Sequence, residues 1–144
     1  MYDIWRMLAV NDLQTLKAKR QALVNIPEQI AELEAQATSI RSATADGAPV
    51  KGGGSGREDM LLNNITEREE LEEELEQTRK RVQKIERALG ILTSTEQRIL
   101  QVRYIDRESG AISKLSCELN LEERTVRNRQ TDALKQFAIA MRGK

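Results

Sequence analysis

Residues 112–137 read ISKLSCELNLEERTVRNRQTDALKQF, and this stretch is the part of the chain that decides the fold. Apolar side chains recur there with helical spacing in two blocks. They are Ile112, Leu115 and Leu119, followed by Val126, Leu134 and Phe137, with small Ala133 beside them. Asn120 stands between the blocks, and asparagine readily accepts the left-handed backbone that a sharp turn requires. Because Ser116 is small enough for two helices to cross closely, the stretch predicts two short helices joined by a tight turn.

The outward face of the second predicted helix is basic and rich in amides. It carries Glu123, Arg124, Arg127, Asn128 and Lys135, with Arg129 and Gln130 at its edge. Arginine, asparagine and glutamine make two-pronged hydrogen bonds to base edges in the major groove. A helix-turn-helix places its second helix in that groove and its first across the backbone. The pattern therefore predicts a DNA-binding helix-turn-helix, and the alternative is a three-helix bundle with no role on DNA.

Composition favours long helices with solvated faces over a sheet, since 32% of the 144 residues are charged and only 3% are aromatic. The only tryptophan, Trp5, is expected to anchor a core or an interface. The formal net charge is zero, but residues 93–144 carry a net +3 and the remainder −3. The C-terminal part is thus the one fitted to a polyanion.

Several function classes are excluded by what the chain lacks. One cysteine and no histidine exclude a disulfide framework and Cys/His zinc sites. No nucleophile with a neighbouring base and no phosphate-binding loop can be found, so we expect neither an enzyme nor a bound cofactor or metal. The cysteine usage predicts a cytoplasmic protein. No apolar run approaches the roughly 20 residues that span a bilayer. Cys117 is expected to be a buried, unreactive thiol.

A heptad pattern occupies residues 11–41 and predicts a helix that packs as in a coiled coil. Its apolar seam consists of Leu16, Leu23, Ile26, Ile30, Leu33, Ala37 and Ile40. Lys19 interrupts the seam once. Pro27 cannot donate a backbone hydrogen bond and clashes with the preceding turn. We therefore expect either a kink at Pro27 or a helix that ends near Asn25, with a new one beginning at Pro27.

A second long helix is predicted from about Glu58 to Ala88, with a solvated face that is acidic first and basic later, as the helix dipole favours. Residues 42–57, SATADGAPVKGGGSGR, are rich in glycine and predict a flexible loop. The two helices can then fold back on each other as an antiparallel hairpin. We interpret residues 1–92 as a coiled-coil-like arm whose exposed apolar flanks favour a homodimer.

The sequence Thr93-Ser94-Thr95-Glu96 fits a capping box, in which the threonine hydroxyl and the glutamate carboxylate satisfy free backbone donors. It predicts a helix over about 94–106, followed by a loop that Gly110 marks. The chain is thus expected to be all-α, with a long hairpin arm followed by a small three-helix domain at 93–144.

Residues 92–137 resemble region 4 of the sigma-70 family. The matching features are the EQRIL…RYI opening, the LNLE turn and the RTVRNR…ALKQF helix. The whole chain is still more similar to phage and prophage regulators of the ArpU/RinA type. Those proteins join a helical N-terminal part, a Gly- and Ser-rich loop and a Glu/Lys-rich helix to a sigma region 4-like helix-turn-helix.

The resemblance implies a sequence-specific regulator that binds double-stranded DNA and activates phage or prophage late genes, in the cytoplasm of a bacterial host at its nucleoid. It also implies contact with RNA polymerase. Carried over residue by residue, base contacts fall on Glu123, Arg124, Arg127 and Asn128. Contacts to the DNA backbone fall on Lys114, Thr125, Arg103, Arg129 and Lys135.

The chain departs from the sigma pattern in three places. Glu122 stands where a serine or threonine usually caps the recognition helix, and the loop after Tyr104 is about two residues longer than usual. No sigma region 2 is found in residues 1–92, so promoter melting is not expected of them. Two alternatives remain open: a DNA-packaging component of the small-terminase kind, and a sigma-like module that binds polymerase without touching DNA.

Overall fold

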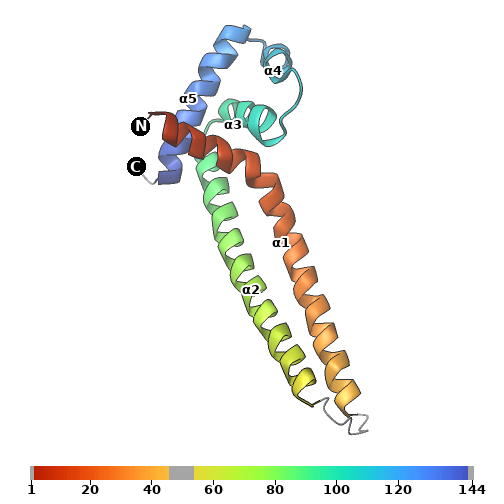
Figure 1. Cartoon of the computed structure of the whole chain (residues 1–144). Helices are drawn as coiled ribbons and strands as arrows, with labels where there is room; N and C mark the ends of the chain where they lie inside the picture. Colours follow the sequence, from red (N-terminus) through yellow and green to blue (C-terminus); the bar gives the residue numbers. More distant parts are fainter. Residues whose placement is uncertain (1, 46–53, 143–144) are drawn as a thin grey trace. The chain divides into compact units, whose positions relative to one another are not determined.

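The computed structural model describes residues 2–45 and 54–142, and within these ranges the chain forms helices and their connections only (Figure 1). In chain order the elements are α1 (Tyr2–Ala45), α2 (Gly54–Ile91), α3 (Ser94–Leu100), the π-helix η1 (Gln101–Ile105), α4 (Ala111–Leu119) and α5 (Glu123–Arg142). The all-α prediction is confirmed. None of the helices within the described ranges has a stretch long and apolar enough to cross a membrane.

The predicted loop at 42–57 is only partly testable, because residues 46–53 lie outside the described residues. Its flanks, 42–45 and 54–57, are not loop but belong to α1 and α2. Both long helices therefore extend further than their heptad patterns indicate.

The contacts divide the chain into two compact units. Unit 1 comprises Met1–Arg20 and Lys80–Lys144, and unit 2 comprises Gln21–Arg79. The predicted boundary between an arm at 1–92 and a domain at 93–144 stays a prediction. The contacts group the first 20 residues and the end of α2 with α3–α5.

Unit 2 contains the second half of α1 and the first part of α2, which lie side by side there. Seam residues of both helices are buried or half-buried, and Ala37 is 2% exposed. Where α2 faces α1 it carries a buried polar side chain, Asn64. Its Nδ2 donates to the carbonyl oxygen of Leu33 at 2.7 Å, and its Oδ1 accepts from Nε of Arg68 at 2.9 Å. Both polar ends of the Asn64 amide are thus satisfied.

Pro27 lies inside α1, which is continuous from Tyr2 to Ala45. The expectation of a helix ending near Asn25 is therefore wrong. A proline in a helix interior costs about 3 kcal/mol. The apolar seam continues on both sides of this position, with Ile26 buried and Ile30 half-buried, and Pro27 itself faces solvent. Burial along the seam offsets the cost of one missing backbone hydrogen bond.

In unit 1 the first turns of α1 and the last turns of α2 are joined by polar contacts. Asp12 is 5% exposed, and its Oδ1 accepts from Arg81 at 2.5 Å. Eight residues further along α1, Arg20 pairs with Glu86 of α2 at 3.1 Å. Fully buried side chains on the same segments supply the apolar contacts of this part of the unit, and they are Leu13, Leu16 and Ile85.

Candidate nucleic-acid interface

The helix that opens the C-terminal region begins at the predicted cap. Thr93 has an extended backbone, and its Oγ1 accepts from the backbone N–H of Glu96 at 3.2 Å. The Thr93 hydroxyl also donates to the Glu96 carboxylate at 3.0 Å. The hydroxyl contact of the predicted capping box is therefore present. The Glu96 carboxylate accepts from the Thr93 hydroxyl, where a full capping box would have it accept from the Thr93 backbone N–H. This cap fixes the start of α3, which η1 then continues to Ile105.

An apolar cluster connects α3, η1, α4 and α5. Its buried members are Ile99, Val102, Ala111, Leu115 and Val126, and Ile112, Leu119 and Leu121 pack against it. The cluster joins residues from both blocks of the stretch that predicted the fold. It sets the angle at which α5 is presented, because a packed core leaves little freedom to the helices that form it.

The turn between α4 and α5 has the predicted left-handed residue. Asn120 has φ 56° and ψ 47°, and its backbone N–H donates to the carbonyl oxygen of Ser116. The backbone N–H of Leu121 donates to the same oxygen at 3.1 Å, while the hydroxyl of Ser116 donates to the carbonyl oxygen of Leu121. Ser116 is therefore more than a small residue at a crossing, because it satisfies polar groups of the turn.

Helix α5 buries one stripe and exposes the side that carries the predicted base contacts. The buried residues are Val126, Gln130, Ala133, Leu134, Phe137, Ala138 and Met141. With 3.6 residues per turn, Arg124 and Asn128 lie opposite this stripe, and Arg127 lies on its flank. All three are exposed. Glu123 is exposed too, and its carboxylate accepts from the hydroxyl of Ser113 at 2.7 Å.

The residues predicted to contact the DNA backbone differ in their exposure and in whether they already have a partner. Arg129 and Lys135 are exposed, and Thr125 is half-buried. Arg103 is exposed, with its guanidinium 5.3 Å from the ring centre of Tyr104. Lys114 is exposed, but its Nζ lies 2.6 Å from a carboxylate oxygen of Glu108. Lys114 must leave this carboxylate, or share its ammonium with it, to contact a phosphate.

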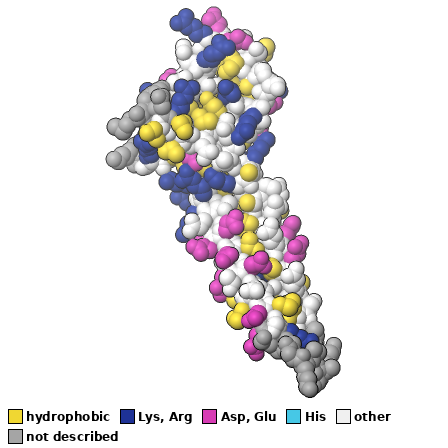
Figure 2. Space-filling view, viewed as in Figure 1, with side chains coloured by type: hydrophobic (Ala, Val, Ile, Leu, Met, Phe, Trp, Pro, Cys, Tyr) yellow, Lys and Arg dark blue, Asp and Glu magenta, His cyan; other side chains and the backbone are white. Residues whose placement is uncertain are grey.

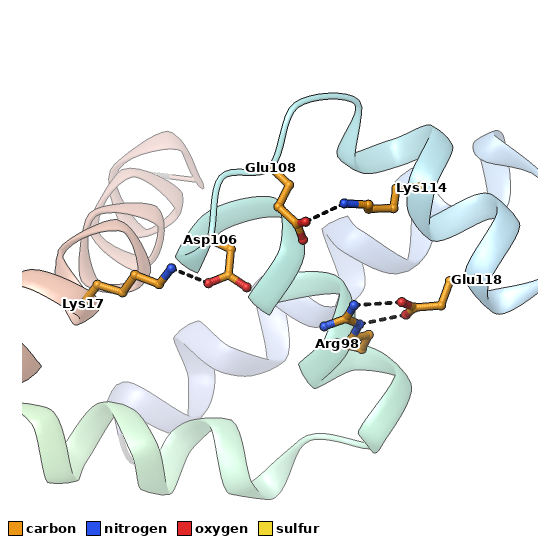
Figure 3. A network of polar contacts seen from close by, with 6 residues as sticks. All are labelled: Lys17, Arg98, Asp106, Glu108, Lys114 and Glu118. Carbon is orange, nitrogen blue, oxygen red and sulfur yellow. Dashed lines mark hydrogen bonds and ion pairs between the residues drawn. The ribbon is translucent and has the colours of Figure 1, made fainter.

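Ion pairs surround the apolar cluster and connect its elements (Figure 3). Arg98 on α3 donates from two nitrogens to both carboxylate oxygens of Glu118 on α4, each at 2.7 Å. The guanidinium lowers the pKa of the Glu118 carboxyl, and the same hydrogen bond raises the pKa of Arg98. This two-pronged geometry fixes α4 relative to α3 more narrowly than a single contact would.

A second pair ties α1 to the end of η1 within unit 1. Lys17 Nζ lies 2.6 Å from Oδ1 of Asp106, which also accepts from Nε2 of Gln101 at 3.1 Å. The hydrogen bond from Lys17, more than any other contact, lowers the pKa of the Asp106 carboxyl. Next to it, Arg107 donates to the carbonyl oxygen of Gln14 at 3.2 Å.

Two residues lie elsewhere than predicted. Gln130 was expected at the edge of the outward face, but it is 9% exposed, and its Nε2 donates to the hydroxyl of Tyr104 at 3.0 Å. Cys117 was expected to be buried, but it is exposed. The physical reason is periodicity, because Gln130 falls one turn after buried Val126 and Cys117 falls opposite buried Leu115 on α4.

The chain was compared with models of protein families, with curated proteins and with solved structures, and none of them matches.

Proposed function

We propose that the protein is a sequence-specific DNA-binding transcriptional regulator in which α3–α5 act as a sigma region 4-like helix-turn-helix. In this proposal α5 lies in the major groove, Glu123, Arg124, Arg127 and Asn128 read bases, and α4 lies across the backbone. The long helices form a hairpin arm that pairs two subunits. The resemblance to ArpU/RinA-type regulators supports activation of phage or prophage late genes, and binding of RNA polymerase, in a bacterial cytoplasm.

One observation carries this proposal above the others. Arg124, Arg127 and Asn128 are exposed in the first half of α5, while Val126 of the same helix is packed into the apolar cluster. A helix that reads bases needs both features, since its readers must be free and its backbone must be held. The left-handed turn at Asn120 and the two-pronged Arg98–Glu118 pair support the same arrangement.

The proposal is tested by selecting duplexes from a random pool with the purified chain and measuring binding to the selected site. Arg127→Ala is expected to cost about 1–3 kcal/mol on that site and to relax the choice at one base position. The reason is that a two-pronged contact between arginine and guanine is lost. Fluorescence anisotropy against the selected duplex and its single-base variants gives both quantities.

Arg129→Ala is the matched control, because it removes an equal charge at a predicted phosphate contact. It should weaken binding alike on selected and unrelated DNA. Equal loss on both kinds of DNA for Arg127→Ala would remove that residue from base reading. A wild-type chain that enriches no sequence and binds no duplex at low salt would overturn the proposed function.

Pairing of subunits through the long helices is supported by exposed apolar side chains. Ile4, Met7 and Leu8 share one face of the start of α1 and are 59%, 71% and 55% exposed. Such neighbouring apolar groups are unfavourable in water unless a partner covers them. We expect a dimer in sedimentation velocity, and its conversion to monomer by Ile4→Glu with Met7→Glu. A ring of eight or more subunits would instead favour the DNA-packaging alternative.

A further inference from the structure

The last turns of α2 carry a row of cations that the proposed reading of DNA by α5 does not use. Lys80, Lys84 and Arg87 are spaced by four and three residues, so they lie on one face of the helix. All three are exposed. Figure 2 shows Lys and Arg side chains gathered over this part of α2, beside the first turns of α1.

These cations are not neutralised by nearby acids. Glu76, four residues before Lys80, is engaged by Arg79 at 2.7 Å. The segment 80–91 contains one carboxylate, Glu86, and it is engaged by Arg20 at 3.1 Å. Within the described parts of the chain, Lys80, Lys84 and Arg87 have no carboxylate oxygen within ion-pair distance. Three like charges on one row repel one another, and a polyanion that meets them relieves this repulsion.

The end of α5 adds a further cation, Arg142, next to this row. Lys84 and Arg142 line one concavity, together with Arg81 and an apolar wall that includes Trp5. The only acid in this concavity is Asp12, and it already binds Arg81. A neighbouring groove holds Arg142 again, now with Lys135, one of the predicted backbone contacts. Arg142 therefore connects the α2 row with the face of α5 assigned to DNA.

We propose that Lys80, Lys84, Arg87 and Arg142 form a flanking basic surface that binds the phosphate backbone of the duplex outside the base pairs read by α5. The inference rests on the proposed function and adds a second contact area to it. The ligand is a stretch of double-stranded DNA longer than the recognised site. Each cation that reaches a phosphate releases bound counterions, so this surface adds affinity and salt dependence without adding sequence preference.

The test compares two duplexes with the same selected centre. The short one covers only the site, and the long one is extended on both sides by about one helical turn of mixed sequence. The wild-type chain is expected to bind the long duplex on the order of tenfold more tightly, with a steeper dependence on salt. This comparison needs no variant, so it stands whether or not any variant folds.

The variant Lys84→Gln/Arg87→Gln/Arg142→Gln should lose the advantage on the long duplex and lower its salt slope by roughly two to three, while binding to the short duplex is unchanged. Lys84→Arg/Arg87→Lys/Arg142→Lys keeps the charges and should retain the advantage. Arg41→Gln/Arg57→Gln, which removes two cations from unit 2, is the control and should behave as wild type.

The outcomes separate the two proposals. A wild-type chain that binds the selected site equally well in both lengths overturns the flanking surface and leaves the reading of DNA by α5 intact. Equal loss on both lengths in the triple variant does the same, because it moves these cations into the primary site. Absence of any binding by wild type overturns the proposed function itself.

Discussion

At the α4 end of the candidate interface, two predicted contact residues are already engaged within the protein. Lys114 binds Glu108, and Glu123 accepts a hydrogen bond from Ser113. The side chains of Arg124, Arg127 and Asn128 on α5 make no hydrogen bond or ion pair within the described residues, and they are exposed. The interface thus combines free side chains with side chains that must exchange a partner when DNA binds.

Substitutions of Lys114 and of Glu108, which form an ion pair, should change the affinity for DNA in opposite directions. Glu108→Gln should raise affinity for all duplexes a few-fold, because it removes a negative charge and frees the ammonium for phosphate. Lys114→Gln should lower affinity for all duplexes and reduce the salt slope by roughly one. Anisotropy titrations at several salt concentrations give both values.

The double variant decides whether the two effects share one cause. If Glu108 acts through Lys114, adding Glu108→Gln to Lys114→Gln restores little affinity, since no ammonium is left to free. A full restoration would show that Glu108 acts only by its own charge. An unchanged salt slope in Lys114→Gln would remove Lys114 from the interface.

The positions of most candidate site residues followed from helical spacing, but their partners did not. Spacing placed Arg124 and Asn128 outward because buried Val126 and Leu134 fix the other side. It could not place Gln130, whose burial depends on Tyr104 from a different element. The pairing of Lys114 with Glu108 depends on the backbone of the loop before α4, which includes left-handed Arg107 and Gly110.

At the scale of single elements, the strongest sequence signals were the ones the structure retains. The heptad seams, the cap at Thr93 and the left-handed turn at Asn120 are local, and each is determined by a few neighbouring residues. Pro27 shows where local rules stop, since α1 continues through it. The propensity of one residue was outweighed by burial along the seam on either side.

Asn64 is the polar residue that fixes how α2 lies on α1 within unit 2. Asn64→Ala is expected to lower the free energy of unfolding by about 1–2 kcal/mol, because it removes the hydrogen bond to Leu33 and leaves Arg68 without its acceptor. Chemical denaturation followed by circular dichroism measures this loss. Asn63→Ala is the control, since Asn63 is exposed and its removal should change stability by less than about 0.5 kcal/mol. Equal effects of the two substitutions would contradict the assigned role.

At the scale of the whole molecule, the division into compact units could not be predicted from the sequence. Heptad spacing continues along α1 without a signal at Arg20, and along α2 without one at Arg79. What joins Met1–Arg20 to α3–α5 is a set of contacts between residues some 90 positions apart, such as Arg107 with Gln14. Periodicity describes one helix at a time and carries no information about such pairs.

The Lys17–Asp106 pair makes part of the stability of unit 1 depend on pH. Because the folded-state pKa of Asp106 is lowered, its contribution is present above the ordinary aspartate pKa of about 4 and is lost as pH falls through the lower folded value. The Tm of Asp106→Asn should therefore lie below that of wild type at about pH 6. On acidification to about pH 3 it should fall by less than the wild-type Tm does. Thermal melts at both pH values test this, with Asp59→Asn, an exposed acid in unit 2, as control. Parallel curves for wild type and Asp106→Asn would contradict it.

The half-buried position of Trp5 gives the protein an intrinsic optical reporter. Trp5 is the only indole in the chain, so emission excited at long wavelength comes from one place. That place is the concavity shared by Lys84, Ala138 and Arg142. Detachment of the first turns of α1 from α5 would expose the indole to water and shift its emission to longer wavelength. Events confined to unit 2 would leave the emission wavelength unchanged. The unfolding of unit 1 can thus be followed in unlabelled protein.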